Sequence, residues 1–254
     1  MSDKVKTEFQ KAKKNRIFQD VVEQIQEAIL NGTLNPGDVL PPERELQETF
    51  NVSRGTLREA LRVLENKGLI EIRLGTGGGA RVKEAGTAQL TETLALMLHS
   101  GALPVLDIGE FREGMEGKIA SLAALRATPK DIKNIEKLLK NALKIAEKGE
   151  ADYQDFLRAD EAIHKEIATI ARNLVYQYLM EVVHDNIQRY YNQFLDFSVS
   201  RLAENCEDLK NLVKAVCEHR SEDAGSIAEE HVRRFNIRMR AKEALSAQKS
   251  ESKK

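Results

Sequence analysis

The sequence predicts a mainly α-helical protein made of two domains, and three observations lead to this prediction. With 254 residues, the chain is long enough to hold two ordinary domains. Strand signals occur only in its first third, whereas apolar residues at helical spacing continue to the end. The apolar residues are mostly aliphatic, with no Trp and 5% aromatic residues, which is typical of helix packing. We therefore expect a small mixed domain followed by an all-helical bundle.

The first predicted domain covers residues 16–84 and follows a flexible tail at residues 1–15 that carries several lysines. Helical spacing of apolar residues, turn residues and a helix-ending glycine define its elements. The expected elements are helices at 17–30, 43–50 and 54–67 and strands at 69–73 and 80–82. Three helices followed by a hairpin predict a winged helix-turn-helix.

Polar side chains cluster at the start of the third predicted helix, where Ser53 also has the position of an N-cap. In a helix-turn-helix, the N-terminal residues of this helix reach base edges in the major groove. Arginine can bind guanine through two donors, and serine or threonine can contact bases or phosphates. A single exposed arginine is usually only solvated, but several polar positions in register favour DNA contact. The expected contacts are Ser53, Arg54, Thr56 and Arg58. Arg44, early in the second predicted helix, is expected to face the DNA backbone.

The glycine-rich run at residues 75–79 has two interpretations. It could cradle the phosphates of a nucleotide, but it lacks the Lys-Ser/Thr ending and the following helix that such loops need. We interpret it as the tip of the wing, placed in the minor groove. The formal net charge of −1 gives no sign of nucleic-acid binding, so the local arrangement of cations has to supply it.

The second predicted domain is all-helical. Residues 85–104 are expected to form a linker and a first helix, residues 105–245 the main bundle, and residues 246–254 a disordered tail. Thr128 before Pro129 is a helix start signal. The expected helices lie at 88–99, 105–126, 129–148, 153–171, 174–197, 202–218 and 221–246.

Three segments of the first domain resemble the DNA-binding domain of GntR-family transcriptional regulators. They are Leu40-Pro41-Pro42-Glu43-Arg44-Glu45-Leu46, Val52-Ser53-Arg54-Gly55-Thr56-Leu57-Arg58-Glu59-Ala60-Leu61 and Leu64-Glu65-Asn66-Lys67-Gly68-Leu69-Ile70. The resemblance implies DNA contacts at Arg44, Arg54, Thr56, Arg58 and the wing glycine Gly75. Leu74 stands where the fatty-acid-responsive member of the family has a polar base reader.

The second domain resembles the FCD-type effector and dimerisation domain of the FadR subfamily. The markers are Glu110-Phe111-Arg112-Glu113-Gly114-Met115-Glu116, Ala120 to Ala123 and Arg126-Ala127-Thr128. The resemblance implies a small organic-acid effector such as lactate, pyruvate or glycolate. Arg112 matches an arginine that points into the effector cavity, where a guanidinium can bind a carboxylate through two donors. Its alternative role is a salt bridge to Glu116, one helical turn on.

A metal site is the third feature that the resemblance implies. Asp160 and His164 are four residues apart on one helix face, which by itself is weak evidence for a shared cation. Many FCD domains bind a divalent metal through this pair and two later histidines. His231 matches the last of these, but Leu209 stands in place of the other. Asp160, His164 and His231 could still hold Zn²⁺, Ni²⁺ or Mn²⁺; alternatively, the metal is lost and these residues bind the effector directly.

The remaining histidines, His99, His184 and His219, match no family ligand and are interpreted as surface or packing residues. Cys206 and Cys217 lack CxxC spacing, and no apolar run reaches a membrane-spanning length, so we expect a cytoplasmic protein with reduced thiols. We expect a homodimeric repressor that binds a pseudo-palindromic operator, rather than an enzyme. The rival functions are a metal-dependent enzyme and an architectural DNA binder without an effector.

Overall fold

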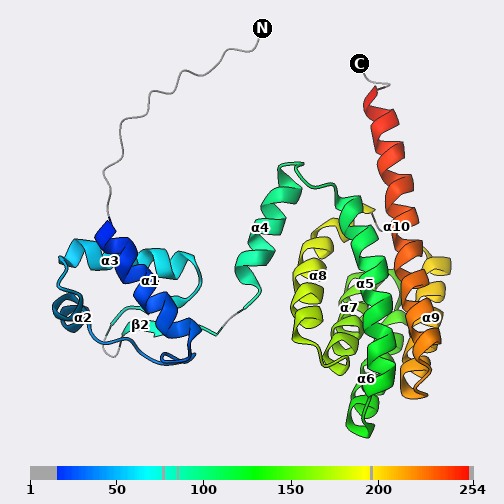
Figure 1. Ribbon diagram of the computed structural model, residues 1–254. Helices are drawn as coiled ribbons and strands as arrows, with labels where there is room; N and C mark the ends of the chain where they lie inside the picture. The colour runs from blue at the N-terminus through cyan, green and yellow to red at the C-terminus, as the bar shows by residue number, and fades with distance from the viewer. Residues whose placement is uncertain (1–15, 76–77, 85, 195–196, 252–254) are drawn as a thin grey trace. The chain divides into compact units, whose positions relative to one another are not determined.

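The computed structural model describes residues 16–75, 78–84, 86–194 and 197–251, and side chains throughout these ranges except at 16, 189–194 and 243–251. The chain divides into two compact units, one ending at Gly86 and the other beginning at Thr87 (Figure 1). The tail expected at residues 1–15 lies outside the described residues. Each unit has its own hydrophobic core.

The first unit consists of three helices and a two-stranded antiparallel sheet, as predicted for a winged helix-turn-helix. Its elements are α1 (Arg16–Leu30), α2 (Glu43–Phe50), α3 (Arg54–Asn66), β1 (Ile70–Arg73) and β2 (Gly79–Val82). In the hairpin, Ile70 pairs with Val82, and both side chains are buried because alternate strand residues face the core. The connection between α2 and α3 turns at Asn51, which has a left-handed backbone with φ of 50°.

The core of the first unit lies mainly between α1 and α3. Both helices are amphipathic, because their apolar residues recur at three- and four-residue intervals along one face. Val21 and Ile25 of α1 are buried with Leu57, Leu61 and Leu64 of α3. The opposite face of α3 is thereby left exposed to solvent.

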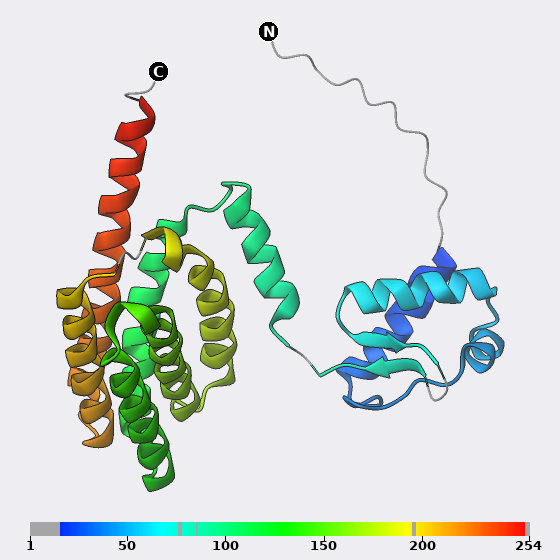
Figure 2. The same ribbon diagram turned by 180° about the vertical axis from the view of Figure 1, so that it is seen from behind.

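The second unit is an all-helical bundle. Its elements are α4 (Ala88–His99), α5 (Val105–Arg126), α6 (Pro129–Ala146), the short 3₁₀ helix η1 (Gly149–Asp152), α7 (Tyr153–Ile170), α8 (Leu174–Phe194), α9 (Val199–Cys217) and α10 (Ser221–Glu251). Figure 2 shows the same bundle from behind. None of the helices in the described ranges is long and apolar enough to cross a membrane.

Helix α5 is the central helix of the bundle, since it contacts α7, α8, α9 and α10. Its most extensive partner is α10, and small residues permit this close approach. A Cβ atom at Gly117 of α5 would lie 3.1 Å from the carbonyl oxygen of Gly225 in α10. A side chain at either glycine would therefore push the two helices apart.

The ends of several helices differ from the sequence prediction, among them α8, which ends at Phe194 rather than 197. Helix α9 begins at Val199 rather than 202, and η1 stands where a loop was expected. Helix α10 runs to Glu251, so residues 246–251, expected to be disordered, are helical. Besides two serines, this stretch contains Ala, Gln, Lys and Glu, which continue a helix readily, and neither Gly nor Pro. Residues 252–254 lie outside the described part of the chain.

Candidate functional site

The start of α3 is organised by Ser53, which is the N-cap of this helix. Its hydroxyl accepts a hydrogen bond from the backbone N–H of Thr56 at 3.2 Å, and the two hydroxyl groups are 2.9 Å apart. The cap satisfies one of the N–H groups that have no partner inside the helix. Ser53 and Thr56 therefore form one polar unit at the N-terminal end of α3.

Glu43, the first residue of α2, holds both arginines of the predicted contact surface. Its carboxylate accepts hydrogen bonds from Nε of Arg58 at 3.0 and 3.2 Å and lies 3.6 Å from Nε of Arg54. The arginine side chains remain 52% and 67% exposed, so both can still reach a partner outside the chain. We call Arg54, Thr56, Arg58 and the cap Ser53 the α3 surface.

Arg44 of α2 and Gly75 after β1 are the other predicted contacts in the first unit. The Arg44 side chain is 92% exposed and its Nε lies 3.8 Å from a carboxylate oxygen of Glu48. Gly75 has a φ of 98°, a backbone conformation that favours glycine and turns the chain after β1. Leu74 beside it is 95% exposed.

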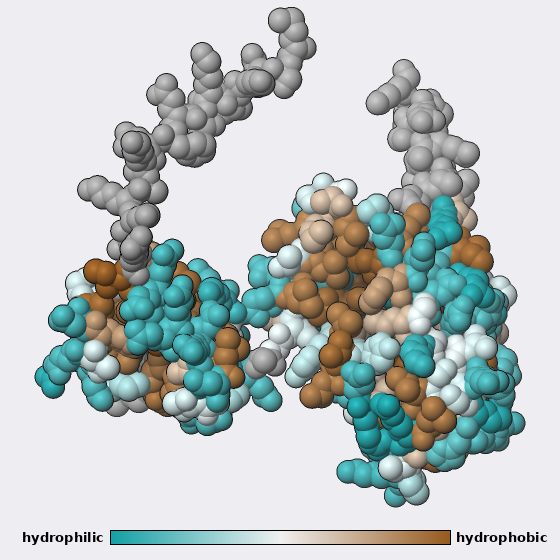
Figure 3. Space-filling model, in the orientation of Figure 1, coloured by the Kyte–Doolittle hydropathy of each residue, from teal (hydrophilic) through white to brown (hydrophobic). Residues whose placement is uncertain are grey.

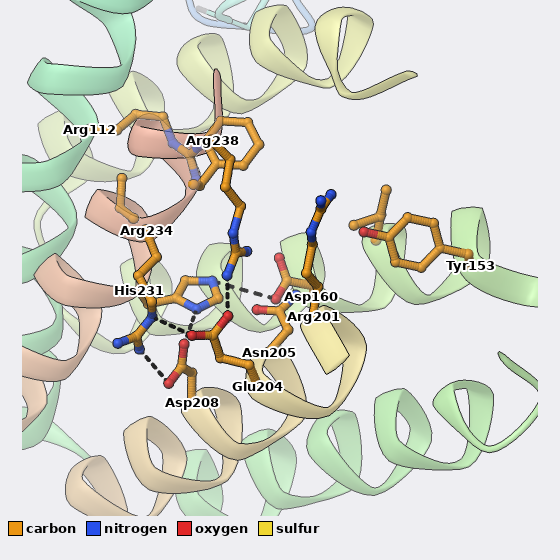
Figure 4. Close-up of a pocket in the computed structure, with 13 residues that line it drawn as sticks. Arg112, Tyr153, Asp160, Arg201, Glu204, Asn205, Asp208, His231, Arg234 and Arg238 are labelled. Atoms are coloured by element: carbon orange, nitrogen blue, oxygen red, sulfur yellow. Dashed lines mark hydrogen bonds and ion pairs between the residues drawn. The ribbon is translucent and has the colours of Figure 1, made fainter. Parts of the chain in front are cut away.

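The second unit encloses a cavity between α5, α7, α9 and α10, with a volume of about 40 Å³ (Figure 4). Its lining is polar and rich in arginine. Arg112 comes from α5, Tyr153, Leu157 and Asp160 from α7, Arg201, Glu204, Asn205 and Asp208 from α9, and His231, Val232, Arg234, Phe235 and Arg238 from α10. A cavity needs about 10–15 Å³ to hold one water molecule, so this one admits a ligand of only a few heavy atoms.

The structure brings together the three predicted metal ligands. Asp160 and His231 line the cavity, and His164 lies next to them without lining it; we call this group the cavity floor. Asp160, His164 and His231 each offer an atom within 4.8 Å of the other two. Nε2 of His164 lies 4.0 Å from Asp160, and Nε2 of His231 lies 3.8 Å from it. Among the described residues, Nε2 of His164 and Oδ1 of Asp160 are buried without a hydrogen-bond partner. Two imidazole nitrogens and a carboxylate oxygen fit a divalent transition metal.

A carboxylate stands behind each of the two imidazoles. Nδ1 of His164 lies 2.5 Å from Oε2 of Glu116, and Nδ1 of His231 lies 3.2 Å from Oδ2 of Asp208 (Figure 4 shows the latter pair). Burial raises the pKa of Asp208, but hydrogen bonds from His231 and Arg234 outweigh it and lower the pKa overall. Both imidazoles thus turn Nε2 towards Asp160.

Glu116 is the centre of a buried ion cluster on α5. It accepts a hydrogen bond from Nε of Arg112 at 2.7 Å and lies 3.1 Å from Nε2 of His184. Burial raises the pKa of Glu116, but Arg112, His164 and His184 together bring this pKa well below its usual value. Burial lowers the pKa of His164, yet the Glu116 carboxylate raises it overall, whereas the pKa of His184 is lowered chiefly by burial. Glu116 is therefore held as a carboxylate.

Comparison with known proteins identifies both units. Residues 18–82 match the family described as "Bacterial regulatory proteins, gntR family", and residues 107–234 match the family of FCD domains. The HTH-type transcriptional regulator LutR of Bacillus subtilis is 34% identical over 194 residues, which cover 74% of this chain and 86% of LutR. The chain belongs to the GntR family. It is a transcriptional regulator with a DNA-binding helix-turn-helix domain and an FCD effector domain.

Two further comparisons agree with membership in the GntR family. The Uxu operon regulator of Haemophilus influenzae is 29% identical over 236 residues, covering 89% of this chain and 82% of that protein. A solved Streptococcus agalactiae GntR structure has the same fold, with a TM-score of 0.67 and 23% identity over 87% of this chain and 98% of that one. These relatives are regulators, and the matched domains are those of regulators rather than enzymes.

The geometry also shows what the sequence analysis of this GntR-family chain missed. Arg112 combines the two alternatives considered for it, because it pairs with Glu116 and also lines the cavity. His184, interpreted as a surface or packing residue, is buried against Glu116. Leu209 is fully buried in the core, while the neighbouring Asp208 reaches His231. The Arg112–Glu116 pair is local, but only the packing of distant helices brings His164 and His184 to Glu116 and His231 to Asp208.

Proposed function

We propose that this GntR-family regulator binds a pseudo-palindromic operator as a homodimer and represses transcription until a small organic acid binds its FCD domain. The observation that carries the proposal is the α3 surface, where a capped helix start presents Arg54 and Arg58 one turn apart on an exposed face, with the partly exposed Thr56 between them in sequence. Arginines at such a helix start can read guanine in the major groove. Arg44 and the wing at Gly75 would contact the DNA backbone and the minor groove.

The dimer is supported by an apolar groove on the second unit, which we call the α4–α8 groove. It is lined by Leu90, Leu94, Leu103, Ile108, Phe111, Leu179, Val182 and Val183 together with Asp107. Figure 3 shows apolar side chains gathered on one part of this unit, and Leu90 and Phe111 are about half exposed, at 51% and 49%. A contiguous apolar surface of this kind is typical of a protein interface. A second copy of the chain is the occupant we propose, because a pseudo-palindrome has two half-sites.

The effector class is supported by the size and charge of the cavity. The small size of the cavity favours a short acid over a sugar acid. Arg112, Arg201, Arg234 and Arg238 line it and can bind carboxylate oxygens. We propose that Arg112 anchors the effector, with Asp160, His164 and His231 holding one divalent ion at the cavity floor. With three protein ligands, such an ion would keep an open coordination position that an effector carboxylate could occupy.

The DNA-binding part of the proposal is tested by footprinting on the promoter region of the chain's own gene. We expect protection of an inverted repeat, with an affinity that falls steeply as the salt concentration rises because phosphate contacts release counterions. Protection of no discrete site by purified protein would overturn it. A promoter fusion in cells lacking the gene then gives the sign of regulation: higher expression indicates repression, and lower expression indicates activation.

The dimer is tested by light scattering on the full chain. Phe111→Glu should shift the molar mass from dimer to monomer, because it places a charge in the α4–α8 groove. Leu125→Glu is the matched control on the same helix, with a side chain that is 65% exposed and outside that groove. A dimer that persists in Phe111→Glu would show that the second copy docks elsewhere.

The effector is tested by thermal-shift measurements with lactate, pyruvate, glycolate and longer acids, each with and without Zn²⁺, Ni²⁺ or Mn²⁺. A ligand that binds only the folded state raises the melting temperature of the protein. We expect the largest shift from a two- to four-carbon acid, and its loss in Arg112→Ala. A shift that is equally large for a six-carbon acid would contradict the size argument.

A further inference from the structure

The two imidazoles at the cavity floor are supported in the same way. Behind His164 stands Glu116, whose carboxylate is held by Arg112 at 2.7 Å. Behind His231 stands Asp208, whose carboxylate is held by Nη2 of Arg234 at 2.5 Å. Each imidazole thus belongs to a row of three side chains: an arginine, a carboxylate and the histidine. In both rows, Nε2 of the histidine faces Asp160.

The carboxylate fixes the orientation of each imidazole ring and determines which ring nitrogen carries the hydrogen. A carboxylate can only accept hydrogen bonds, so an Nδ1 atom that bonds to it has to carry the hydrogen, as Nδ1 of His231 does towards Asp208. The lone pair needed by a metal is then left on Nε2, the atom that faces Asp160 in both residues. A carboxylate behind a ligating imidazole also raises its basicity and prevents the ring from rotating.

We infer that Glu116 and Asp208 are a matched pair of positioning carboxylates, which present Nε2 of His164 and His231 to a divalent cation held at Asp160. This inference rests on the metal site of the proposed function and deepens it. The support matters more here than in a site with four protein ligands, because Leu209 leaves only three. Each remaining ligand then supplies a larger share of the affinity.

Asp208 gives the cleaner test of the pair. Glu116 is completely buried and also holds Arg112 and His184, so its removal disturbs the fold as well as His164. Asp208 lies at the cavity wall with 15% of its side chain exposed. Glu207, the preceding residue of α9, has a side chain that is 62% exposed, pairs with Lys210 and does not line the cavity. Glu207 is therefore a matched control for the loss of one negative charge.

The experiment measures Zn²⁺ affinity of the full chain by competition with a chelator, and the visible absorption of the Co²⁺-loaded protein. Asp208→Ala should weaken Zn²⁺ binding about 10- to 100-fold, as is usual for a lost supporting partner, and should alter the Co²⁺ spectrum. Asp208→Asn keeps an oxygen that can accept from Nδ1, so it should restore part of the affinity. Glu207→Gln should leave both measurements close to those of the unmodified chain.

A second variant tests the other half of the pair. Glu116→Gln retains the size of the side chain, and circular dichroism and the melting temperature without metal show whether it folds. In folded protein, we expect a loss of Zn²⁺ affinity similar to that of Asp208→Ala. If the unmodified chain binds Zn²⁺ but Asp208→Ala binds it equally well with the same Co²⁺ spectrum, the inference is wrong and the proposed metal site stands. If the unmodified chain binds neither ion, the metal site and the inference fall together.

Discussion

Arg54 and Arg58 stand on an exposed helix face, with 67% and 52% of their side chains accessible, whereas the side chains of Asp160 and His164 are only 10% and 2% exposed. In the first unit, the α3 surface comes from one helix start and one supporting carboxylate, Glu43. In the second, they come from α7 and α10 and depend on carboxylates from α5 and α9.

This difference teaches which kind of site tolerates change. Exposed charges lose little hydration and can swap partners, so each contact in the α3 surface contributes separately. Buried charges need every partner in place, because an unpaired charge in the interior is costly. We therefore expect graded effects from substitutions in the α3 surface and cooperative effects from those around the cavity.

Removal of an arginine from the α3 surface should produce the largest effect. Arg58→Ala should weaken specific operator binding about 10- to 100-fold, since a bidentate contact with guanine contributes about 1–3 kcal/mol. Binding to unrelated DNA should change much less. Electrophoretic mobility shifts on operator and scrambled DNA measure both. Arg62→Ala, one turn further along the exposed face of α3, is the control; equal losses on the two DNAs would exclude base reading by Arg58.

Addition of a fourth metal ligand at position 209 tests the buried site of the second unit. Leu209→His should raise Zn²⁺ affinity, measured by calorimetry, because it adds an imidazole at the position of the fourth family ligand. It should also lower the free energy of unfolding by about 1–3 kcal/mol, since Leu209 is fully buried and a polar group replaces it. Leu212→His on the same helix should show only the loss of stability. Unchanged Zn²⁺ affinity in Leu209→His would contradict the alignment of this position.

The capping box of α6 tests whether the two units are independent in stability. Thr128 and Asp131 bond each other's side chains and backbone, and this lowers the pKa of Asp131. Asp131→Asn should destabilise the second unit by about 1 kcal/mol at neutral pH. The stabilisation is present above the unfolded-state pKa of about 3.9 and is lost as the pH falls through the lower folded value, so the deficit should vanish in acid. Thermal unfolding followed against pH measures this effect.

Two outcomes bear on the Asp131→Asn prediction. Glu136→Gln, an exposed substitution in the same helix, should leave the melting temperature unchanged. Operator binding should also be unaffected by Asp131→Asn, because the first unit has its own core. A deficit that persists at low pH would mean that the carboxylate charge is not what stabilises the helix start.

The smallest effect is expected from Glu43→Gln. It releases Arg54 and Arg58 and removes a negative charge close to the proposed DNA surface. Affinity for unrelated DNA should rise up to about fivefold, in keeping with the 0.2–1 kcal/mol of exposed ion pairs, and the ratio of specific to nonspecific affinity should fall. Glu45→Gln in the same helix changes the charge equally and controls for it. An unchanged ratio would show that Glu43 does not orient the arginines.

Much of the fold could be predicted from local patterns. The order of helices and hairpin, the Ser53 cap and the capping-box start of α6 follow from residues close together in sequence. The ends of α9 and α10 could not be predicted as well, because helix ends depend on packing and on weak propensities. The prediction that Asp160, His164 and His231 share a site came from family resemblance, and the structure brings them together.

By itself, the sequence determined the two-domain helical organisation and the face of α3 that is left exposed, because helical periodicity and capping act over a few residues. Only the tertiary structure decided the surroundings of the candidate metal ligands. Glu116 reaches His184 across 68 residues of sequence, and Asp208 reaches His231 across 23. These contacts exist because α5, α7, α8, α9 and α10 pack around one core, and no local pattern encodes which side chains that packing brings face to face.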